Sequence, residues 1–451
     1  MKKSVSLLFW AFFIATITAQ STAGIRLVTL RGSLDLALAN SPQLKKAQLE
    51  REGFDLRLKE ARSAVYPQID GGIRYEYAPV LPTQLMPGEI FGMTEGTYIP
   101  AQFGQPWQMV GSVTLTQRIY DESMFRGIPA IDAGRAVSNL LVARTEEEIL
   151  YNTATVFYQT FQTEQLLRSV NANVEKLDAL QRMAELQLAN DYAIPTDVKR
   201  IRVARTNLET QRQKLLTGIS VLHQMLQYLC GVPFDQSLQL TENMTNPAAD
   251  SLRWLSLRFE PDSLTEHLLI LRSLELNRIQ TSSKWAERLP SLSAYATGLY
   301  QTWRNDANIF NSNGTWYGAA AFGLKLDVPI FDGFSRNRKV NVLELEALKL
   351  EEDRRQLDGA KMLEFRQARE ELQNSIRLLQ YQSDNVALAR EITDKLLLQY
   401  REGVVPLTDL LNAQTAMSEA ETNYWQQVFG YKLAVLKLLK ATGKMEELQK
   451  Q

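Results

Sequence analysis

The chain has 451 residues, a formal net charge of −1, and nearly equal numbers of basic and acidic side chains, 50 and 51. Such balanced charge is unlike that of a nucleic-acid-binding protein, so we expect no nucleic acid among its partners. The single cysteine, Cys230, excludes an intrachain disulfide and a thiolate metal cluster, and its apolar neighbours favour a core position.

Residues 1–23 are predicted to be a secretory signal peptide. Lys2 and Lys3 precede an apolar stretch that is followed by small and polar residues. Cleavage after Ala19 or after Ala23 fits this pattern. No later apolar run approaches the ~20 residues of a membrane-spanning helix. We therefore expect an exported protein that does not cross a bilayer by a helix.

An internal repeat divides the remaining chain into residues 24–245 and 246–451. Each repeat has the same predicted order: a lead-in helix, two strands around a loop, and two long helices around a tight turn. The lead-in is shorter in the second repeat. Residues matched between the first and second repeats are 119–121 and 330–332, Thr196-Asp197 and Thr408-Asp409, and Gly231 and Gly443.

The predicted β-hairpins cover residues 67–120 and 290–331. Apolar and polar residues alternate along 107–119 and again along 316–328, and aromatic residues stand near the ends. This pattern is typical of transmembrane β-strands. A small sheet that covers a soluble helical bundle would show the same alternation, but the signal peptide and the aromatic residues favour the membrane. Residues 78–106, rich in Pro and Gly, are predicted to be an exposed loop.

Four strands per chain are too few to close a barrel, because the smallest outer-membrane barrels have about eight. An open sheet edge in lipid would leave backbone groups without hydrogen-bond partners. Several copies must therefore share one barrel. Two copies would supply about eight strands and three copies about twelve.

Long helical hairpins are predicted over residues 130–231 and 335–443. Gly and Pro are absent from 135–192, and apolar residues recur at the three- and four-residue spacing of coiled-coil packing. At the tip of the second hairpin, Gly403 suits a helix end that needs positive φ, and Asp191 holds this place in the first. The helices that follow are predicted to be capped by Thr196 or Asp197 and by Thr408 or Asp409.

These features together resemble the outer-membrane efflux protein family, the TolC-like channels of tripartite export systems. The resemblance is carried by segments 30–47, 61–69 and 324–340 and by the two hairpin tips, and it covers essentially the mature chain. It implies a mainly α protein with a transmembrane β-barrel. Three copies would share one twelve-stranded barrel in the outer membrane of a Gram-negative bacterium, above a periplasmic helical tunnel.

The resemblance also implies partners: outer-membrane lipid, a periplasmic adaptor (membrane fusion protein) and an inner-membrane pump of the RND or ABC type. The hairpin tips would form the tunnel entrance and contact the adaptor. A ring of tip aspartates would favour cations, whereas helix capping alone would also explain these residues. A further aspartate and a latching arginine of the family are replaced here by Asn412 and Val405. The entrance residues are Thr196, Asp197, Gly403, Val404, Val405, Thr408 and Asp409. Among them, Val404 and Val405 are expected to be exposed apolar residues suited to docking an adaptor hairpin.

The sequence therefore predicts a passive exit duct with no catalysis, no cofactor and no metal site. His223 and His267 are the only histidines, and neither has a Cys, Asp or Glu at ligand spacing. A structural or adhesive periplasmic coiled-coil protein without a continuous pore is the competing interpretation. A soluble enzyme on a helical scaffold would need a catalytic cluster, and the sequence contains no recognisable one.

Overall fold

The computed structural model describes residues 26–192, 194–236, 238–241, 251–308 and 314–450. The predicted signal peptide lies outside these residues, as does the predicted boundary between the two repeats. The chain forms two compact units, described separately here. The sheet unit holds residues 43–145 and 260–361, and the hairpin unit holds the rest. Each unit takes segments from both halves of the chain, and the repeat boundaries stay a prediction.

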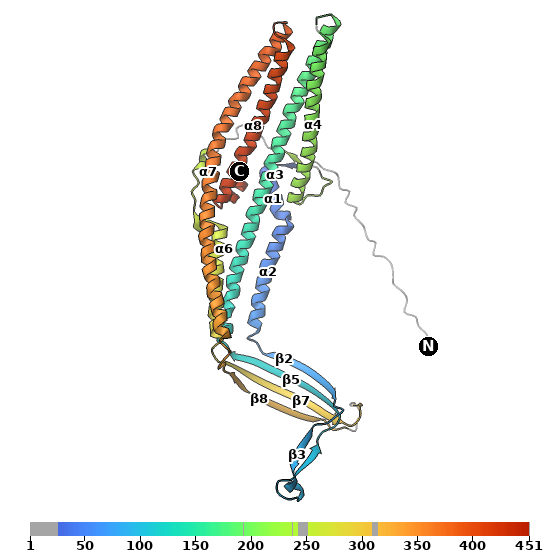
Figure 1. Cartoon of the computed structure of the whole chain (residues 1–451), viewed down its shortest axis with the longest axis vertical. Helices are drawn as coiled ribbons and strands as arrows, with labels where there is room; N and C mark the ends of the chain where they lie inside the picture. The colour runs from blue at the N-terminus through green and yellow to red at the C-terminus, as the bar shows by residue number, and fades with distance from the viewer. Residues whose placement is uncertain (1–25, 193, 237, 242–250, 309–313, 451) are drawn as a thin grey trace, which may run out of the picture. The chain divides into compact units, whose positions relative to one another are not determined.

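The sheet unit combines a four-stranded sheet, a small hairpin and helices (Figure 1). Helices α3 and α7 begin in this unit and continue into the other. The elements are α2 (Pro42–Ser63), β2 (Gln68–Tyr77), β3 (Thr83–Pro87), η1 (Gly88–Phe91), β4 (Tyr98–Gln102), β5 (Trp107–Tyr120), the start of α3 (Glu122–Ala189), η2 (Pro261–Ser263), α6 (Thr265–Ala286), β7 (Ser291–Arg304), β8 (Tyr317–Asp327) and the start of α7 (Ser335–Arg401).

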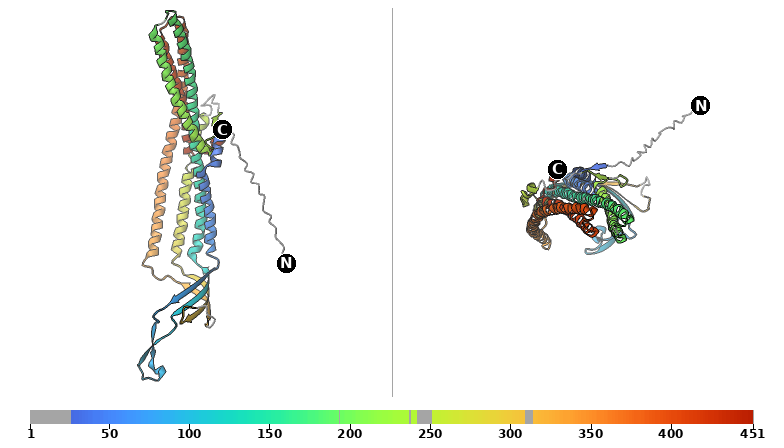
Figure 2. Two further views of the ribbon diagram at one scale, coloured as in Figure 1. Left: turned by 90° about the vertical axis from the view of Figure 1, so that its right-hand side faces the viewer. Right: turned by 90° about the horizontal axis from the view of Figure 1, so that it is seen from above.

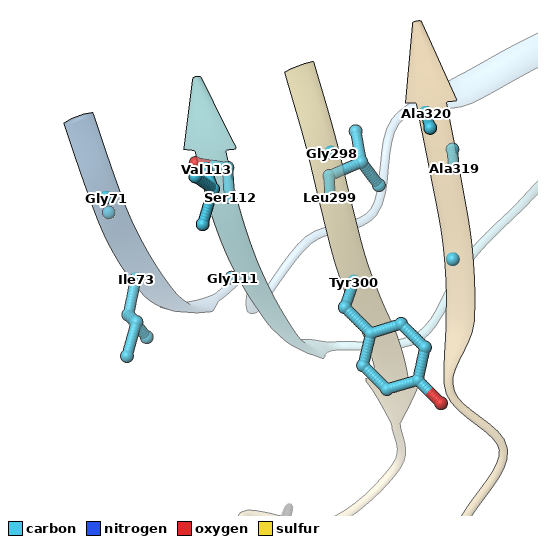
Figure 3. A pocket seen from close by; sticks show the side chains of 12 residues that line it. Gly71, Ile73, Gly111, Ser112, Val113, Gly298, Leu299, Tyr300, Ala319 and Ala320 are labelled. Atoms are coloured by element: carbon cyan, nitrogen blue, oxygen red, sulfur yellow. The ribbon is translucent and has the colours of Figure 1, made fainter. Parts of the chain in front are cut away.

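The main sheet has the antiparallel order β2-β5-β7-β8. This confirms the predicted contribution of four strands per chain. Because β2 and β8 are each paired on one side within the described chain, both edges of the sheet are free. Over the middle of the sheet lies an open hollow of about 1080 Å³ (Figure 3), lined by small and apolar residues such as Gly71, Gly298 and Ala320. Its lining offers no carboxylate, amine or imidazole.

The two faces of the sheet differ in polarity at β8. Phe322, Leu324 and Leu326 lie on one face and are exposed, whereas Lys325 and Asp327 form an ion pair of 2.9 Å on the other. Burying such an apolar face away from water is strongly favourable. The exposed face therefore requires an apolar environment that the isolated chain does not supply.

Aromatic rings gather at the end of the sheet where β2 meets β5. Tyr77 and Tyr75 stack on Trp107, with ring centroids 4.3 and 5.4 Å apart, and Tyr300 stacks on Trp316 at 5.3 Å. The segment predicted as an exposed loop, residues 78–106, differs from that expectation because β3 and β4 pair within it as an antiparallel hairpin. The many Gly and Pro residues of this segment predict a loop, so the short pairing was not predicted.

A matched aspartate ends each strand-to-helix junction. Asp121 accepts hydrogen bonds from the Ser123 hydroxyl (2.6 Å) and the Met124 amide (3.3 Å), and so caps α3. Asp332 accepts a hydrogen bond from the Arg336 amide (2.9 Å) at the start of α7. Orphan amides at helix starts explain why both repeats carry an aspartate here.

The turn into α7 is the more strained of the two junctions. Gly333 and Phe334 both adopt positive φ, 65° and 66°. Phe334 is 59% exposed and contacts Phe331 edge to face, with centroids 5.4 Å apart. A bulky residue in this conformation costs energy that glycine avoids.

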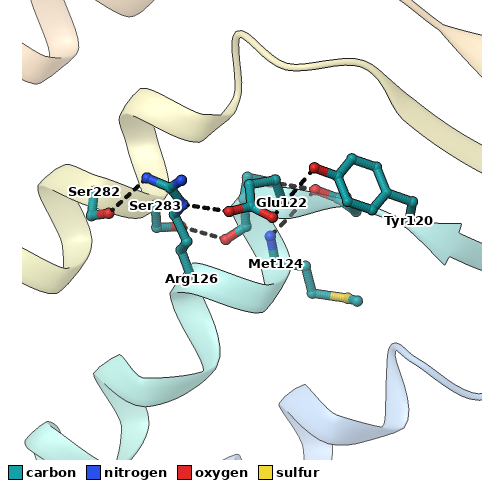
Figure 4. Close-up of polar contacts among 8 residues, drawn as sticks. Tyr120, Glu122, Met124, Arg126, Ser282 and Ser283 are labelled. Atoms are coloured by element: carbon teal, nitrogen blue, oxygen red, sulfur yellow. Dashed lines mark hydrogen bonds and ion pairs between the residues drawn. The ribbon is translucent and has the colours of Figure 1, made fainter.

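Polar and small residues join the helices of the sheet unit. Arg126 of α3 donates to Ser282 of α6 (3.3 Å; Figure 4). Gly127 lets the same two helices approach, because a Cβ there would lie 3.1 Å from the hydroxyl of Ser283. Glu266 of α6 forms a 2.9 Å ion pair with Lys361 of α7. The first predicted lead-in is divided between α1 and α2, and α2 and α6 each have 22 residues.

The hairpin unit is built on four long helices that Figure 1 shows in the order α7, α8, α3, α4. Its core is largely supplied by α8, α3 and α7, with Phe157, Tyr431 and Leu439 fully buried. A short parallel pairing of β1 with β6 was not predicted. The elements are β1 (Arg26–Val28), α1 (Leu30–Asn40), α4 (Pro195–Cys230), β6 (Leu238–Leu240), α5 (Ser251–Leu255), α8 (Leu407–Ala441), η3 (Met445–Lys450), and the remainders of α3 and α7.

None of the helices in the described part of the chain is sufficiently long and apolar to span a membrane.

Candidate functional site: the hairpin tips

The two hairpin tips share one hydrophobic cluster. Leu180 and Ala184 of α3, Ile201 of α4, Tyr400 of α7 and Leu410 of α8 are buried together. These residues come from all four helices at the three- and four-residue spacing expected of packed rods. Both tips of one chain therefore lie side by side, and the predicted site residues of the two halves of the sequence are brought to one place.

The first tip is a tight turn between α3 and α4. Asp191 adopts φ of 60°, as predicted for the residue that stands in place of a glycine. The N-cap is Ile194, followed by Pro195 at the first helical position. Proline is favoured there because its missing N–H needs no partner. The predicted capping by Thr196 or Asp197 is therefore wrong: both lie inside the first turn, where the aspartate still benefits from the helix dipole.

The second tip has the same design. Gly403 adopts φ of 71° and ends α7 as predicted. Pro406 is the N-cap of α8 and makes no side-chain cap bond, so capping by Thr408 or Asp409 is also wrong. A proline placed immediately before the helix takes the position that the threonine would otherwise use.

The two valines at this tip differ in exposure. Val404 is 70% exposed, whereas Val405 is half-buried against the tip cluster. The expectation that both are exposed is therefore wrong for Val405. Its side chain continues the apolar stripe that leads into Leu407. Near the first tip, Tyr192 and Ile194 are exposed, by 86% and 58%.

Arg200 links the two tips within one chain. Its guanidinium donates to the Thr408 hydroxyl (3.2 Å) and lies 3.7 Å from the Asp197 carboxylate. Sequence analysis missed this residue. The signal available was its position three residues after Asp197, on the same face of α4. The partner on the other hairpin could not be read from local spacing.

Tyr400 joins α7 to α3 just above the turn. Its hydroxyl donates to the Gln187 side-chain oxygen at 3.4 Å. Burial raises the pKa of Tyr400, and the nearby negative charge of Asp197 raises it further. Tyr400 therefore stays a neutral hydrogen-bond donor. The negative charge of Asp197, on the first hairpin, acts on this side chain of the second hairpin.

A buried polar layer ties the hairpins together farther from the turns. The Gln414 amide of α8 donates to Asn173 of α3 at 2.9 Å, and Asn173 donates to Glu421 at 3.4 Å. Glu421 also accepts a hydrogen bond from Ser169 and lies 3.5 Å from Arg390. Buried polar contacts of this kind fix the register of paired helices.

No group of three or more His, Cys, Asp or Glu side chains suited to a metal ion occurs in the described residues. The two histidines lie apart from the tips: His223 contacts Glu164 (2.9 Å), and His267 contacts Asp358 (2.7 Å). What the tips present instead is carboxylates in the first turns of two helices, a bridging guanidinium and exposed apolar side chains. Such a set can attract cations and dock another helix.

Known proteins are similar to this chain in sequence and in fold. Residues 273–444 match the model of the family described as outer membrane efflux protein. The chain is 22% identical over 426 residues to the outer membrane protein TolC of Escherichia coli, covering 91% of this chain and 81% of that protein.

Two solved structures share the fold. CusC, described as forming a transmembrane channel, superposes with a TM-score of 0.71 at 13% identity, covering 92% of this chain and 91% of CusC. The outer membrane channel CmeC of Campylobacter jejuni gives 0.68 at 16% identity, covering 92% and 85%. The second half of the chain thus matches the outer membrane efflux protein family, and nine-tenths of the chain aligns with TolC.

Proposed function

We propose that three copies of this chain form an outer-membrane exit duct, which passes substrates passively from an inner-membrane pump and a periplasmic adaptor to the exterior. The observation that carries the proposal is a sheet with both edges free, on the same chain as two long helical hairpins. Free edges in lipid are costly, and a shared barrel removes them. Three copies supply about twelve strands.

The polarity of the sheet supports a membrane position. The exposed face of β8 carries Phe322, Leu324 and Leu326, which suit lipid. The opposite face carries Lys325 and Asp327, which suit a water-filled bore. Strands that alternate in this way are apolar toward lipid and polar toward the lumen in outer-membrane barrels.

The hairpin tips would form the entrance of the tunnel. Arg200 bridges the two tips within a chain and would hold the closed arrangement. Asp197 and Asp409 of three copies would set carboxylates around a narrow bore, which favours cations. The exposed side chains of Tyr192 and Val404 would contact the helical hairpin of an adaptor. We assign no catalytic step to the chain, and the energy would come from the pump, whether of the RND or ABC type.

Two measurements on protein extracted from outer membranes test the duct. Unboiled samples should migrate as trimers that heat converts to monomers, and trimers in planar bilayers should conduct ions. A structural or adhesive coiled-coil protein without a pore would give membrane-associated oligomers and no conductance. Trimers that never conduct, even after the tip bridge is removed by Arg200→Ala, would contradict the duct and favour that alternative.

A further inference from the structure

The junction between β5 and α3 carries three partly exposed aromatic rings and two guanidiniums. Tyr120 ends β5, Phe125 lies in the first turn of α3, and Trp285 lies in the last turn of α6, with exposed fractions of 42%, 41% and 43%. The ring centroids of Tyr120 and Phe125 are 6.3 Å apart. The guanidiniums of Arg126 and Arg288 lie over the Trp285 ring, with Cζ atoms 5.8 and 5.6 Å from its centroid. We call these five residues the junction site.

Strand register places the junction site at the border of the apolar face of the sheet. Tyr120 is paired with Leu292 of β7, which is paired with Leu326 of β8. Residues paired in this way lie on one face, and Leu326 belongs to the exposed apolar face. A β-bulge separates Tyr120 from Arg118, which belongs to the row of Lys325 on the polar face. The apolar face therefore ends at Tyr120, beside the two guanidiniums.

Hydrogen bonds hold the guanidinium of Arg126 in place (Figure 4). The Tyr120 hydroxyl donates to Glu122 at 3.4 Å, and Glu122 accepts from Nε of Arg126 at 2.6 Å. Nη1 of Arg126 donates to the Ser282 hydroxyl at 3.3 Å, which ties α3 to α6, the helix beside it (Figure 2). In the described residues, Nη2 has no hydrogen-bond partner. Arg126 is thus fixed by the protein on one side and can bind a ligand on the other.

Arg288 carries a charge that no carboxylate of the described chain balances. It follows α6 and is exposed. Its neighbour Glu287 pairs instead with Lys284 at 2.6 Å, and Glu122 pairs with Arg126. A guanidinium that stacks on an aromatic ring keeps its N–H groups available, because they lie in its own plane. The junction site therefore offers one unbalanced positive charge with free donors.

These features together suit a phosphate group that is attached to an apolar body. A guanidinium binds phosphate through two parallel hydrogen bonds. Tyrosine and tryptophan favour the boundary between hydrocarbon and water, because each has an apolar body and a polar end. Beyond Tyr120, the row through Leu292 and Leu326 continues the apolar surface. A free phosphate ion would use the guanidiniums and gain nothing from this row.

The second repeat shows that each chain has one such site. At the spacing of 211 residues that relates the strand-to-helix junctions, Phe331 stands in place of Tyr120 and Asn337 in place of Arg126. Phe331 has no hydroxyl to hold a carboxylate, and Asn337 has no guanidinium. The junction into α7 therefore lacks the set of donors that the junction into α3 presents.

We propose that the junction site binds an anionic phospholipid, with its phosphate held by Arg288 and Arg126 and its acyl chains laid along the apolar face of the sheet. This inference rests on the membrane position in the proposed function and names the lipid chemistry that is recognised there. A zwitterionic headgroup is disfavoured, because its cationic end would lie beside two guanidiniums.

Lipid binding to purified trimers tests the site. Trimers of the full chain in a neutral detergent are titrated with phosphatidylglycerol, and bound lipids are counted by native mass spectrometry. We expect saturation at one lipid per chain. Arg288→Gln should weaken binding about tenfold or more, because hydrogen bonds to a charged group are lost. The matched control, Arg118→Gln, removes the same charge near the same end of β5, on the polar face, and should bind as the wild type does.

Phosphatidylcholine and inorganic phosphate serve as comparison ligands, and both should bind more weakly than phosphatidylglycerol. Equal binding of inorganic phosphate would indicate a simple anion site and overturn the lipid assignment. Wild-type binding by Arg288→Gln, or an equal loss in Arg118→Gln, would overturn the site itself. If the trimers still conduct ions in these cases, the duct stands. Absence of any trimer would overturn both.

Discussion

Removing the guanidinium of Arg200 should open the entrance. Arg200 spans the two tips within a chain, because it contacts Thr408 of the second tip at 3.2 Å and Asp197 of the first tip at 3.7 Å. Its side chain is 51% exposed, so a contribution of about 0.5–1 kcal/mol per chain is expected. Three symmetric copies act on one entrance, so the closed state of Arg200→Ala loses about 1.5–3 kcal/mol. That free energy raises the ratio of open to closed channels about 10- to 150-fold.

Single-channel recording in planar bilayers measures this ratio directly, as the frequency and duration of high-conductance openings. The matched control is Arg202→Ala, which removes the same charge two residues away on an exposed part of α4. It should leave the openings near wild type. An Arg200→Ala channel that stays as closed as the wild type, or equal opening in both variants, would refute the bridging role and leave only a general effect of charge.

Four further outcomes are expected. Asp197→Asn with Asp409→Asn should weaken cation preference, measured as a reversal potential shifted toward zero in a salt gradient; an unchanged potential would leave these carboxylates outside the bore. Gly403→Ala should destabilise the tip by about 1 kcal/mol, because φ is 71° there, and lower the dissociation temperature of the trimer. Gly359→Ala, in the middle of α7 with open space around it, should instead stabilise the protein by about 0.5–1 kcal/mol; equal effects would contradict the backbone explanation. Burial raises the pKa of Glu266, but the hydrogen bond and charge of its α7 lysine outweigh this, so the pKa is below its ordinary 4.5. The stabilisation from ionised Glu266 is present above that ordinary pKa and is lost as pH falls through the lowered one. Glu266→Gln should therefore flatten the acid limb of a thermal-stability curve. An unaltered acid limb would contradict this contribution of Glu266.

Much of the fold follows from local patterns in the sequence. Alternation along residues 107–119 predicts β5, and the long runs without Gly or Pro predict α3. Pro129 nevertheless lies inside α3, seven positions after its start and beyond the first four amides that lack an intrahelical partner. The helix therefore continues through the loss of one backbone hydrogen bond there. The positive φ of Gly403 was predictable because glycine is the residue that most often ends a helix in this conformation.

The parts that could not be predicted depend on contacts between distant segments. The parallel pairing of β1 with β6 joins residues far apart in the chain, and three residues are too few for a pattern. The bridge from Arg200 to Thr408 links the two repeats and is a property of their packing. Val405 was expected to be exposed because it follows Val404 in a turn, yet it packs against the tip cluster. Local spacing identifies the helix ends, and tertiary packing decides which residues at each end are buried or bonded.

At the turn into α7, a phenylalanine occupies a strained backbone conformation. Phe334 holds a conformation that glycine or asparagine would adopt with less strain, whereas Tyr120 and Phe125, the aromatic pair at the junction into α3, have no positive φ. Phe334→Gly should therefore make the free chain easier to fold while removing a ring from the rim of the sheet. A ring anchored in lipid would offset that strain. In the proposed barrel, Phe334 would therefore mark the level at which the polypeptide leaves the aqueous compartment.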